Sequence, residues 1–365
     1  GPIPWGFYLV LSAAFGFMLH VRKRTRQKYS EACRPVLGNK VDGIAGKLID
    51  LIAVFALLAG TATTFSLATP LLAGAISSVT GIPQSTGLTL VILVIVCAIY
   101  TFSVYFGMKG VQLSAATCTW LFFGLLAYVF FFGGQTRFII EEGITALGNL
   151  TQNFIGLATW TDSLRTSSFP QTWTIFYWAY WMVWCVAVPF FIGSISKGRT
   201  LRQVILGGYV FGLSGTFTSF IIMGNYGLGL QMHGKLDVLS SYAADGNLYH
   251  AILDILGQLP LSKAVLVLLV LCMITFYSTS FDSITMVAST YTYKELKSDE
   301  EPHRNVKLFW AIFLILLPLA LIFSENSMSN LQTVSIIAAF PVGIIMLLII
   351  MSFFKDADAY LKEQK

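Results

Sequence analysis

Charged residues are scarce in this 365-residue sequence: Asp, Glu, Lys and Arg make up 11% of it, where soluble domains average about 25%. The five Cys are scattered and lie mostly inside apolar runs, which excludes a disulfide scaffold. What the chain has in abundance is hydrophobic residues, at 56%, with a mean hydropathy of +0.73. We therefore predict an integral membrane protein.

Catalytic motifs are also missing. The four His lie in or near predicted loops, so the sequence offers no helical haem ligation and no zinc site of the His-Glu-x-x-His type. No Walker A, G-x-S-x-G or G-x-G-x-x-G motif follows a predicted strand. We expect no enzyme and no cofactor. We also expect no nucleic-acid partner, because the basic residues lie in short loops between apolar runs, despite a net charge of +5.

Long charge-free runs predict about nine transmembrane helices, each able to hold roughly 20 residues. The longest run is divided at the Thr69-Pro70 step and again at residues 81–87. Lipid allows only helices or closed barrels, and the alternation that a barrel needs is absent, so the predicted fold is all-α. The expected spans are 4–21, 46–68, 88–106, 117–134, 173–194, 204–225, 263–290, 306–323 and 331–354.

The distribution of basic residues predicts the orientation. All but four of the 23 Lys and Arg fall on one side if the loop after the first span is cytoplasmic. By the positive-inside rule, the first residues then lie outside the cell membrane, and the tail 355–365 lies in the cytoplasm. Residues 136–165 are predicted to form an amphipathic helix on the outer surface, and residues 197–206 a short cytoplasmic interfacial helix that enters the next span.

Aromatic residues between Trp173 and Trp184 follow helical spacing, as do Trp5 and Tyr8 near the start of the chain. Such stripes are usually membrane-interface anchors or core packing. The alternative is a cage for a quaternary ammonium ion, which is attracted to ring faces and needs no carboxylate. Both groups start from the same outer face, so they could converge on one cavity.

A second group lies in the span 263–290, where Phe276, Thr279 and Ser280 are followed by Asp282. Hydroxyls in membrane helices often bond to their own helix or to a neighbouring one. The alternative is a Na⁺ site of hydroxyl and carbonyl oxygens. Asp282 needs a partner, an aqueous vestibule or a functional role. Asp50 is expected to snorkel or to pair with Lys47.

The chain resembles the betaine/carnitine/choline transporter family. The resemblance rests on residues 169–181 and 195–202, which look like the family's signature helix and the cytoplasmic segment after it, and on residues 1–5, 67–71 and 109–112. It implies a twelve-helix fold with two inverted repeats, like that of the sodium-coupled leucine transporter. The chain would then be an N-terminally truncated member that contains helices four to twelve.

On that pattern, residues 1–365 form one transporter domain. Residues 1–134 would be the remainder of the first repeat, 135–168 the outer amphipathic helix and 173–354 the second repeat. The resemblance also implies a homotrimer in the lipid bilayer that carries glycine betaine, carnitine or choline, solutes used in osmoprotection.

The resemblance carries over residue roles as well. Trp5, Tyr8, Tyr180 and Trp181 match the aromatic box that holds the substrate, with Tyr180 in place of the usual Trp. The positions that match the route from the box towards the cytoplasm are Trp173, Tyr177 and Trp184. Those that match the sodium half-site are Phe276, Thr279 and Ser280.

Two modes of transport are open, because the family contains Na⁺ symporters and sodium-independent exchangers. The exchangers carry an Arg where this chain has Cys118, and a Met where it has Val188. A pocket with two hydroxyls and no fixed guanidinium favours a symporter, with Na⁺ as the coupling ion. An exchanger is the alternative, and a non-transporting membrane sensor or structural protein is a more distant one.

Overall fold

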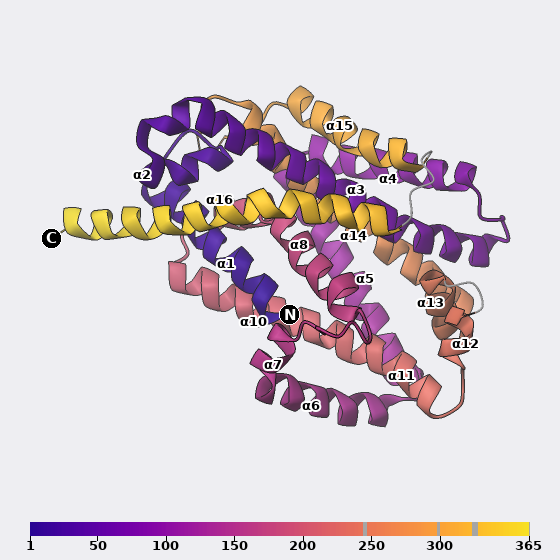
Figure 1. The fold of residues 1–365 in the computed structure, drawn as a ribbon. Helices are drawn as coiled ribbons and strands as arrows, with labels where there is room; N and C mark the ends of the chain where they lie inside the picture. Colours follow the sequence, from indigo (N-terminus) through magenta and orange to yellow (C-terminus); the bar gives the residue numbers. More distant parts are fainter. Residues whose placement is uncertain (244–246, 298–299, 323–327, 365) are drawn as a thin grey trace.

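The computed structural model describes residues 1–243, 247–297, 300–322 and 328–364, and these form helices and loops without strands (Figure 1). Seven helical segments are long and apolar enough to cross a membrane, and a bent pair makes an eighth. The segments are Pro2–Val21, Ile44–Thr80, Thr86–Tyr105, Met108–Phe132, Leu201–Met232, Ser262–Thr292 and Thr333–Glu363, with Pro170–Trp184 and Val188–Ile195 as the bent pair. The predicted all-α membrane fold is confirmed.

The elements follow one another along the chain with short connections. The longer helices are α1 (Pro2–Gly16), α3 (Ile44–Thr80), α4 (Thr86–Tyr105), α5 (Met108–Phe132), α6 (Thr136–Gln152), α10 (Leu201–Ser219), α14 (Ser262–Thr292), α15 (Arg304–Ile322) and α16 (Met328–Glu363). The shorter ones are α2 (Arg34–Leu37), α7 (Phe154–Thr159), α8 (Ile175–Trp184), α9 (Val188–Ile195), α11 (Asn225–Met232), α12 (Val238–Ala243) and α13 (Leu248–Gly257). Three π-helical segments, η1 (Phe17–Val21), η4 (Pro170–Thr174) and η5 (Phe220–Gly224), join or extend them.

Several predicted boundaries are wrong. α3 does not end at the Thr69-Pro70 step but continues through Pro70 to Thr80, and stops where Gly81 adopts a left-handed conformation (φ +78°). One proline removes one backbone donor, which packing on both sides can compensate. α5 begins nine residues before the predicted 117, directly after Gly107. α15 coincides with the predicted span 306–323 but is not one of the eight candidates.

Two predicted segments continue into longer helices. Thr200 caps α10 in a reciprocal hydrogen-bonded box with Gln203, so residues 201–206 enter the next span as expected and are the first turns of α10, whereas 197–200 precede that helix. α16 runs on to Glu363, so most of the tail 355–365 is helical. The predicted outer amphipathic helix is divided into α6 and α7, followed by a loop.

The span predicted over 173–194 is bent by 44° between α8 and α9. Pro189 lies in the first turn of α9. Its ring removes the backbone donor that would bond back into the preceding turn, so the helix breaks there. The first half of the span, α8, packs against α16, α3 and the start of α1, and the second half, α9, packs beside the end of α1.

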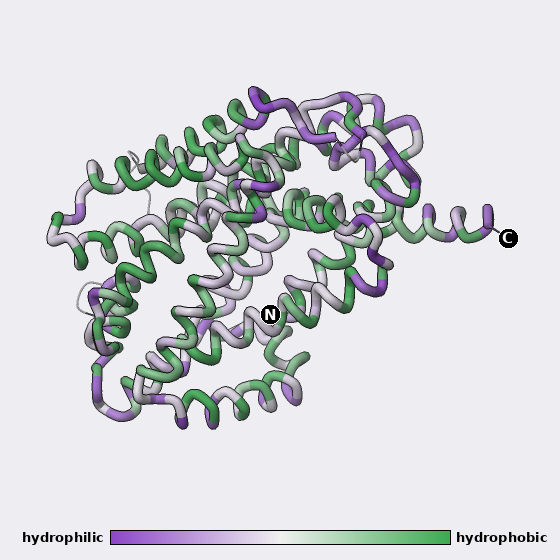
Figure 2. Tube along the Cα trace, turned by 180° about the vertical axis from the view of Figure 1, so that it is seen from behind, coloured by the Kyte–Doolittle hydropathy of each residue, from purple (hydrophilic) through white to green (hydrophobic). Residues whose placement is uncertain are grey.

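The core forms around α3, which packs against α14, α15 and α16, while α1 packs against α9 and α10. A second apolar cluster lies among α5, α6, α11, α13 and α14. Polar segments gather at the ends of the helices, and the greater part of each long helix is apolar (Figure 2).

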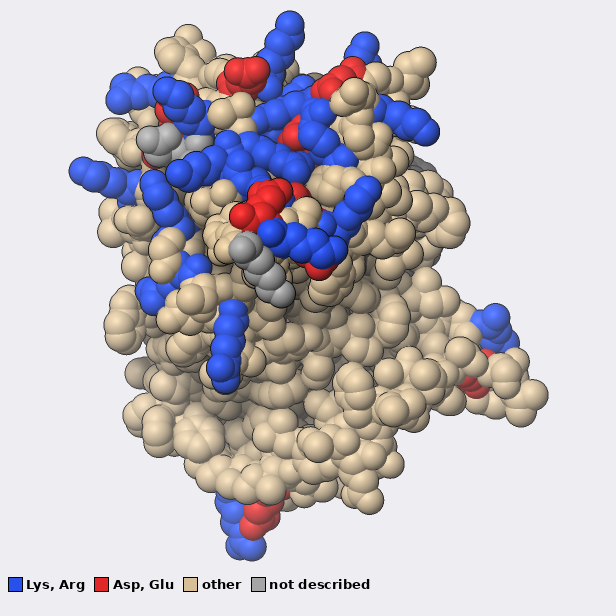
Figure 3. Space-filling view, turned by 90° about the vertical axis from the view of Figure 1, so that its left-hand side faces the viewer, with Lys and Arg blue, Asp and Glu red and all other residues tan. Residues whose placement is uncertain are grey.

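One end of the molecule carries most of the charge, with Lys and Arg interspersed with Asp and Glu (Figure 3). Arg22 connects the loop after α1 to α16 through Asp356 (3.0 Å) and Glu363 (2.7 Å). The expected pair of Asp50 with Lys47 does not form. Asp50 accepts the backbone N–H of Ser30 instead, at 2.9 Å.

Candidate functional site

Three aromatic side chains from the two predicted groups meet between α1 and α8. The rings of Tyr8 and Trp181 have centroids 4.7 Å apart, and Trp5 lies 5.9 Å from each of them. Tyr8 is buried, whereas Trp5 and Trp181 are half-buried. We call Trp5, Tyr8 and Trp181 the aromatic cluster.

The sequence explains how α1 presents its part of the cluster. Trp5 and Tyr8 are three residues apart, so both lie on one face of α1. Trp5 is held against α10 by a hydrogen bond from its Nε1 to Thr216 Oγ1 (3.2 Å). Gly212 makes this approach possible, because a Cβ there would lie 2.5 Å from the Trp5 ring.

A pocket of about 560 Å³ adjoins the aromatic cluster at the start of α8. Its walls come from the first residues of α1, from α6, α7, η4, α8, and from α10 with η5. Trp173, Tyr177, Trp178 and Trp181 supply four aromatic side chains, and the described lining contains no Asp, Glu, Lys or Arg. Such a surface offers ring faces and apolar contacts but no anionic partner.

Tyr180 does not join the aromatic cluster, although it was predicted to belong to the same box. Its ring pairs with Phe176 (5.5 Å) and Trp184 (6.1 Å) on its own helix. Its hydroxyl lies 2.5 Å from Thr64 Oγ1 on α3, which supplies the partner that a tyrosine in place of tryptophan requires. Adjacent residues on a helix are rotated by about 100°, so Tyr180 and Trp181 face different neighbours.

The other predicted aromatic residues lie on both sides of the cluster. Trp173 and Tyr177, with centroids 6.2 Å apart, line the pocket at the first end of α8. The direction of the route assigned to these two residues stays a prediction, because it depends on the orientation of the chain in the membrane. Trp184 is 8% exposed and packs against Gly60 of α3, towards the other end.

Sequence reasoning missed Trp178. It lines the pocket and its ring lies 6.0 Å from Phe7. It belongs to the same aromatic run but falls off the helical stripe through Trp173 and Trp184. The aromatic composition of the run therefore included Trp178, but the helical spacing did not single it out. The pocket contacts a wider face of α8 than the single stripe through Trp173 and Trp184.

The predicted sodium residues lie on α14. Phe276 is 43% exposed, Ser280 is exposed and Thr279 is half-buried. Thr279 donates a hydrogen bond to the carbonyl of Phe276 (3.1 Å), as a hydroxyl does when it bonds back to its own helix. Cys118 of α5 lies beside the hydroxyls of Thr275 and Thr279.

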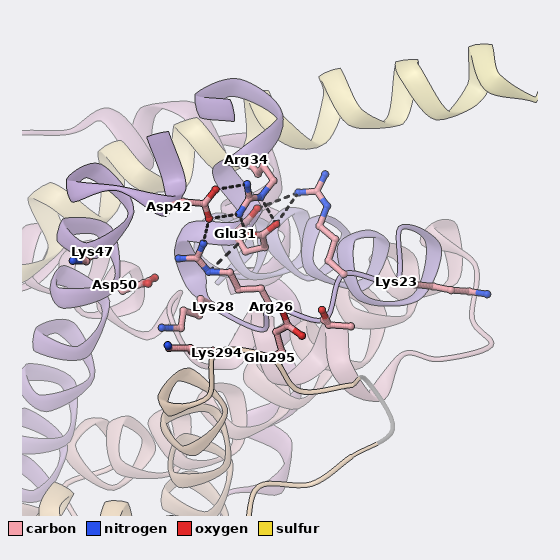
Figure 4. Close-up of a pocket in the computed structure, with 12 residues that line it drawn as sticks. Lys23, Arg26, Lys28, Glu31, Arg34, Asp42, Lys47, Asp50, Lys294 and Glu295 are labelled. Carbon is pink, nitrogen blue, oxygen red and sulfur yellow. Dashed lines mark hydrogen bonds and ion pairs between the residues drawn. The ribbon is translucent and has the colours of Figure 1, made fainter. Parts of the chain in front are cut away.

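A second, larger pocket of about 650 Å³ lies at the charged end (Figure 4). Seven Lys or Arg and four Asp or Glu line it. Arg34 donates to both Glu31 (2.6 Å) and Asp42 (2.8 Å), and its hydrogen bond to Asp42 holds the pKa of that carboxyl below its usual range. The excess positive charge repels a cationic ligand, so the aromatic pocket is the better candidate for a quaternary ammonium.

Comparison with known proteins finds similarity to membrane transporters. The model of the betaine/carnitine/choline family transporters matches residues 1–362. A carnitine transporter of Acinetobacter baumannii is 29% identical over 346 residues, which are 94% of this chain. The chain spans 62% of the length of that relative.

Proposed function

This chain belongs to the betaine/carnitine/choline transporter family, and on that premise we propose that it moves a trimethylammonium solute across the membrane by alternating access. The observation that carries the proposal is the aromatic cluster beside a pocket whose described lining has no Asp, Glu, Lys or Arg. Glycine betaine, carnitine and choline share the trimethylammonium head, whose diffuse charge suits ring faces.

The solute would enter between α6, α7 and α8, contact Trp173 and Tyr177, and lodge its head against the cluster at Trp181. Trp178 would form another wall of the entrance. Tyr180 would shape the site from behind through its bond to Thr64 rather than by contact with the solute. The charged end would face the cytoplasm, as would the end of α16.

We further propose that transport is coupled to Na⁺ through the hydroxyls of Thr279 and Ser280 with the carbonyl of Phe276. Support comes from Cys118, which lies beside Thr279. An Arg at that position would bring a guanidinium next to the hydroxyls. A chain that carries Cys there leaves room for a mobile cation. We also propose a homotrimer, which native mass spectrometry would test.

The test is uptake of radiolabelled glycine betaine and carnitine by the full gene product in proteoliposomes. Concentrative uptake that needs an inward Na⁺ gradient, and that Thr279→Ala with Ser280→Ala abolishes, supports symport. Ser289→Ala, a buried hydroxyl change on the same helix, serves as the matched control and should leave sodium dependence intact.

Two other outcomes would contradict parts of the proposal. Uptake that ignores Na⁺ and requires a preloaded betaine would make the protein an exchanger and leave the hydroxyls of α14 as helix-packing groups. If neither solute moves under any gradient, and neither binds, the transport proposal fails and a sensor or structural role takes its place.

A further inference from the structure

The helix α10 covers one face of the Trp5 ring. A Cβ added to Gly212 would lie 2.5, 2.6 and 2.7 Å from three adjacent atoms of the six-membered ring, Cε2, Cζ2 and Cδ2. A point at nearly equal distances from three neighbouring ring atoms lies over the face of the ring and not beside its edge. The backbone of α10 at Gly212 therefore packs directly on the indole, and a larger residue there would displace the ring.

Two linked hydrogen bonds fix how the ring is turned in its own plane. Trp5 Nε1 donates to Thr216 Oγ1 at 3.2 Å, and the same hydroxyl donates to the carbonyl oxygen of Gly212 at 2.9 Å. The second bond uses the only proton of the hydroxyl, so its oxygen is presented to the indole as an acceptor. An indole nitrogen is a donor only, so the two groups match. One turn of α10 thus contacts both the face and the N–H edge of Trp5.

The contact between α1 and α10 is in register along both helices. Leu9 lies one turn after Trp5, and Gly208 lies one turn before Gly212. A Cβ added to Gly208 would overlap the side chain of Leu9, which is 0% exposed. Two glycines four residues apart therefore receive two side chains four residues apart, as small residues do where membrane helices approach closely. This fit sets how deeply Trp5 lies against α10.

Trp5 is the anchored member of the aromatic cluster. The rings of Tyr8 and Trp181 each lie 5.9 Å from it, and their planes are turned from its plane by 77° and 62°. Within the described residues, neither the Tyr8 hydroxyl nor the Trp181 ring nitrogen takes part in a hydrogen bond. The two rings therefore pack edge to face against a third ring that α10 holds in place.

We propose that Thr216 and Gly212 are positioning residues of the aromatic cluster, and that they set its affinity for the trimethylammonium head through Trp5. This inference rests on the proposed function, because the affinity concerned is that for the solute. Thr216 also lines the pocket, but its hydroxyl proton is already used, and a trimethylammonium head neither donates nor accepts an ordinary hydrogen bond. Its effect on the solute therefore passes through the ring that it orients.

The first test removes the hydroxyl while keeping the shape of the side chain. Binding of glycine betaine is measured on the full gene product in nanodiscs, and the indole N–H resonances of isotope-labelled tryptophan are recorded without solute. Thr216→Val should weaken binding about fivefold and shift the resonance that Trp5→Phe removes, because one hydrogen bond is lost. Thr216→Ser keeps the hydroxyl and should restore both readouts.

A double-mutant cycle separates positioning from direct contact. Phe has no N–H, so Thr216→Val should not weaken binding further in a Trp5→Phe protein. If it weakens binding there as much as in the wild type, Thr216 acts on the solute directly and the proposal is overturned. An indole resonance that stays in place in Thr216→Val overturns it as well. Both results are independent of the Gly212 variant and of whether that variant folds.

The role of Gly212 has a matched control on the same helix. Gly212→Ala and Gly215→Ala gain the same helix propensity, but a Cβ added to Gly215 meets no atom within 4 Å. We expect Gly212→Ala to weaken betaine binding roughly tenfold and Gly215→Ala to stay within about twofold. Equal affinities would refute the role of Gly212. A wild type that binds no betaine would refute the proposed function and the effect on affinity with it, whereas the indole resonance still tests the placement of Trp5 without solute.

Discussion

The loss of Trp181 is the sharpest test of the aromatic cluster. Its ring lies 4.7 Å from Tyr8 and 5.9 Å from Trp5, so it is the member that joins α8 to α1. A cation held against a desolvated ring gains about 2 kcal/mol. At about 1.4 kcal/mol for each factor of ten, Trp181→Ala should weaken the binding of glycine betaine roughly 30-fold.

Equilibrium binding to the full gene product, measured by calorimetry or scintillation proximity, gives the affinity directly. Trp181→Phe keeps a ring face and should lose less than about fivefold. Trp120→Ala is the control, since Trp120 on α5 is 79% exposed and far from the cluster in sequence and packing. The thermal unfolding temperature of each variant shows whether a loss of affinity comes from the missing ring contact or from a destabilised protein.

A neutral carbon analogue of betaine, with a tert-butyl group in place of trimethylammonium, distinguishes the physical cause. If Trp181→Ala weakens the analogue as much as betaine, the ring acts by apolar contact and the cation–π argument is wrong. A folded Trp181→Ala protein with unchanged betaine affinity would refute the placement of the solute at this cluster.

Three further predictions concern other parts of the chain. Thr279→Ala with Ser280→Ala should abolish concentrative, Na⁺-driven uptake while betaine binding in the absence of Na⁺ stays within about twofold, as measured in flux and binding assays. Tyr180→Phe should lower the unfolding free energy by about 1 kcal/mol through loss of the 2.5 Å bond to α3, with little change in affinity, by chemical denaturation. Asp162 accepts hydrogen bonds from the backbone and hydroxyls of residues 166–168, which hold its pKa below the usual range. The order of that loop should therefore be constant at neutral pH and be lost as the pH falls below about 4, as followed by amide NMR shifts, and loop order that is insensitive to acid would contradict it.

The spans could be predicted because lipid imposes a simple rule on sequence. A helix in lipid must satisfy its backbone hydrogen bonds internally and present apolar side chains to the bilayer. Runs without charged residues therefore mark where helices cross the membrane. Their ends could not be predicted as well. Pro70 lies within α3 without ending it, while Pro189 begins a new helix at a bend of 44°. Pro70 lies inside a helix that packs against α14, α15 and α16, whereas Pro189 lies in the first turn of α9, where a backbone donor is not needed.

Part of the candidate site could likewise be predicted from the sequence, and part could not. The stripe of aromatic residues identified α8 and α1, and the expected convergence of Trp5, Tyr8 and Trp181 is observed. Periodicity could not separate Tyr180 from Trp181, since both are adjacent aromatic residues on one helix. The tertiary contacts distinguish the two residues. Tyr180 hydrogen-bonds to Thr64 on α3, whereas Trp181 faces α1.

The sequence by itself determined that this protein is a helical membrane protein of the betaine/carnitine/choline family, because hydrophobicity and an aromatic signature are properties of composition and order. Only the tertiary structure decided which rings meet, that Trp178 lines the pocket, and that Asp282 has Ser103 as its single described partner. These depend on contacts between residues more than a hundred positions apart. Such contacts arise from the packing of α1, α4, α8 and α14 and leave no local pattern in the chain.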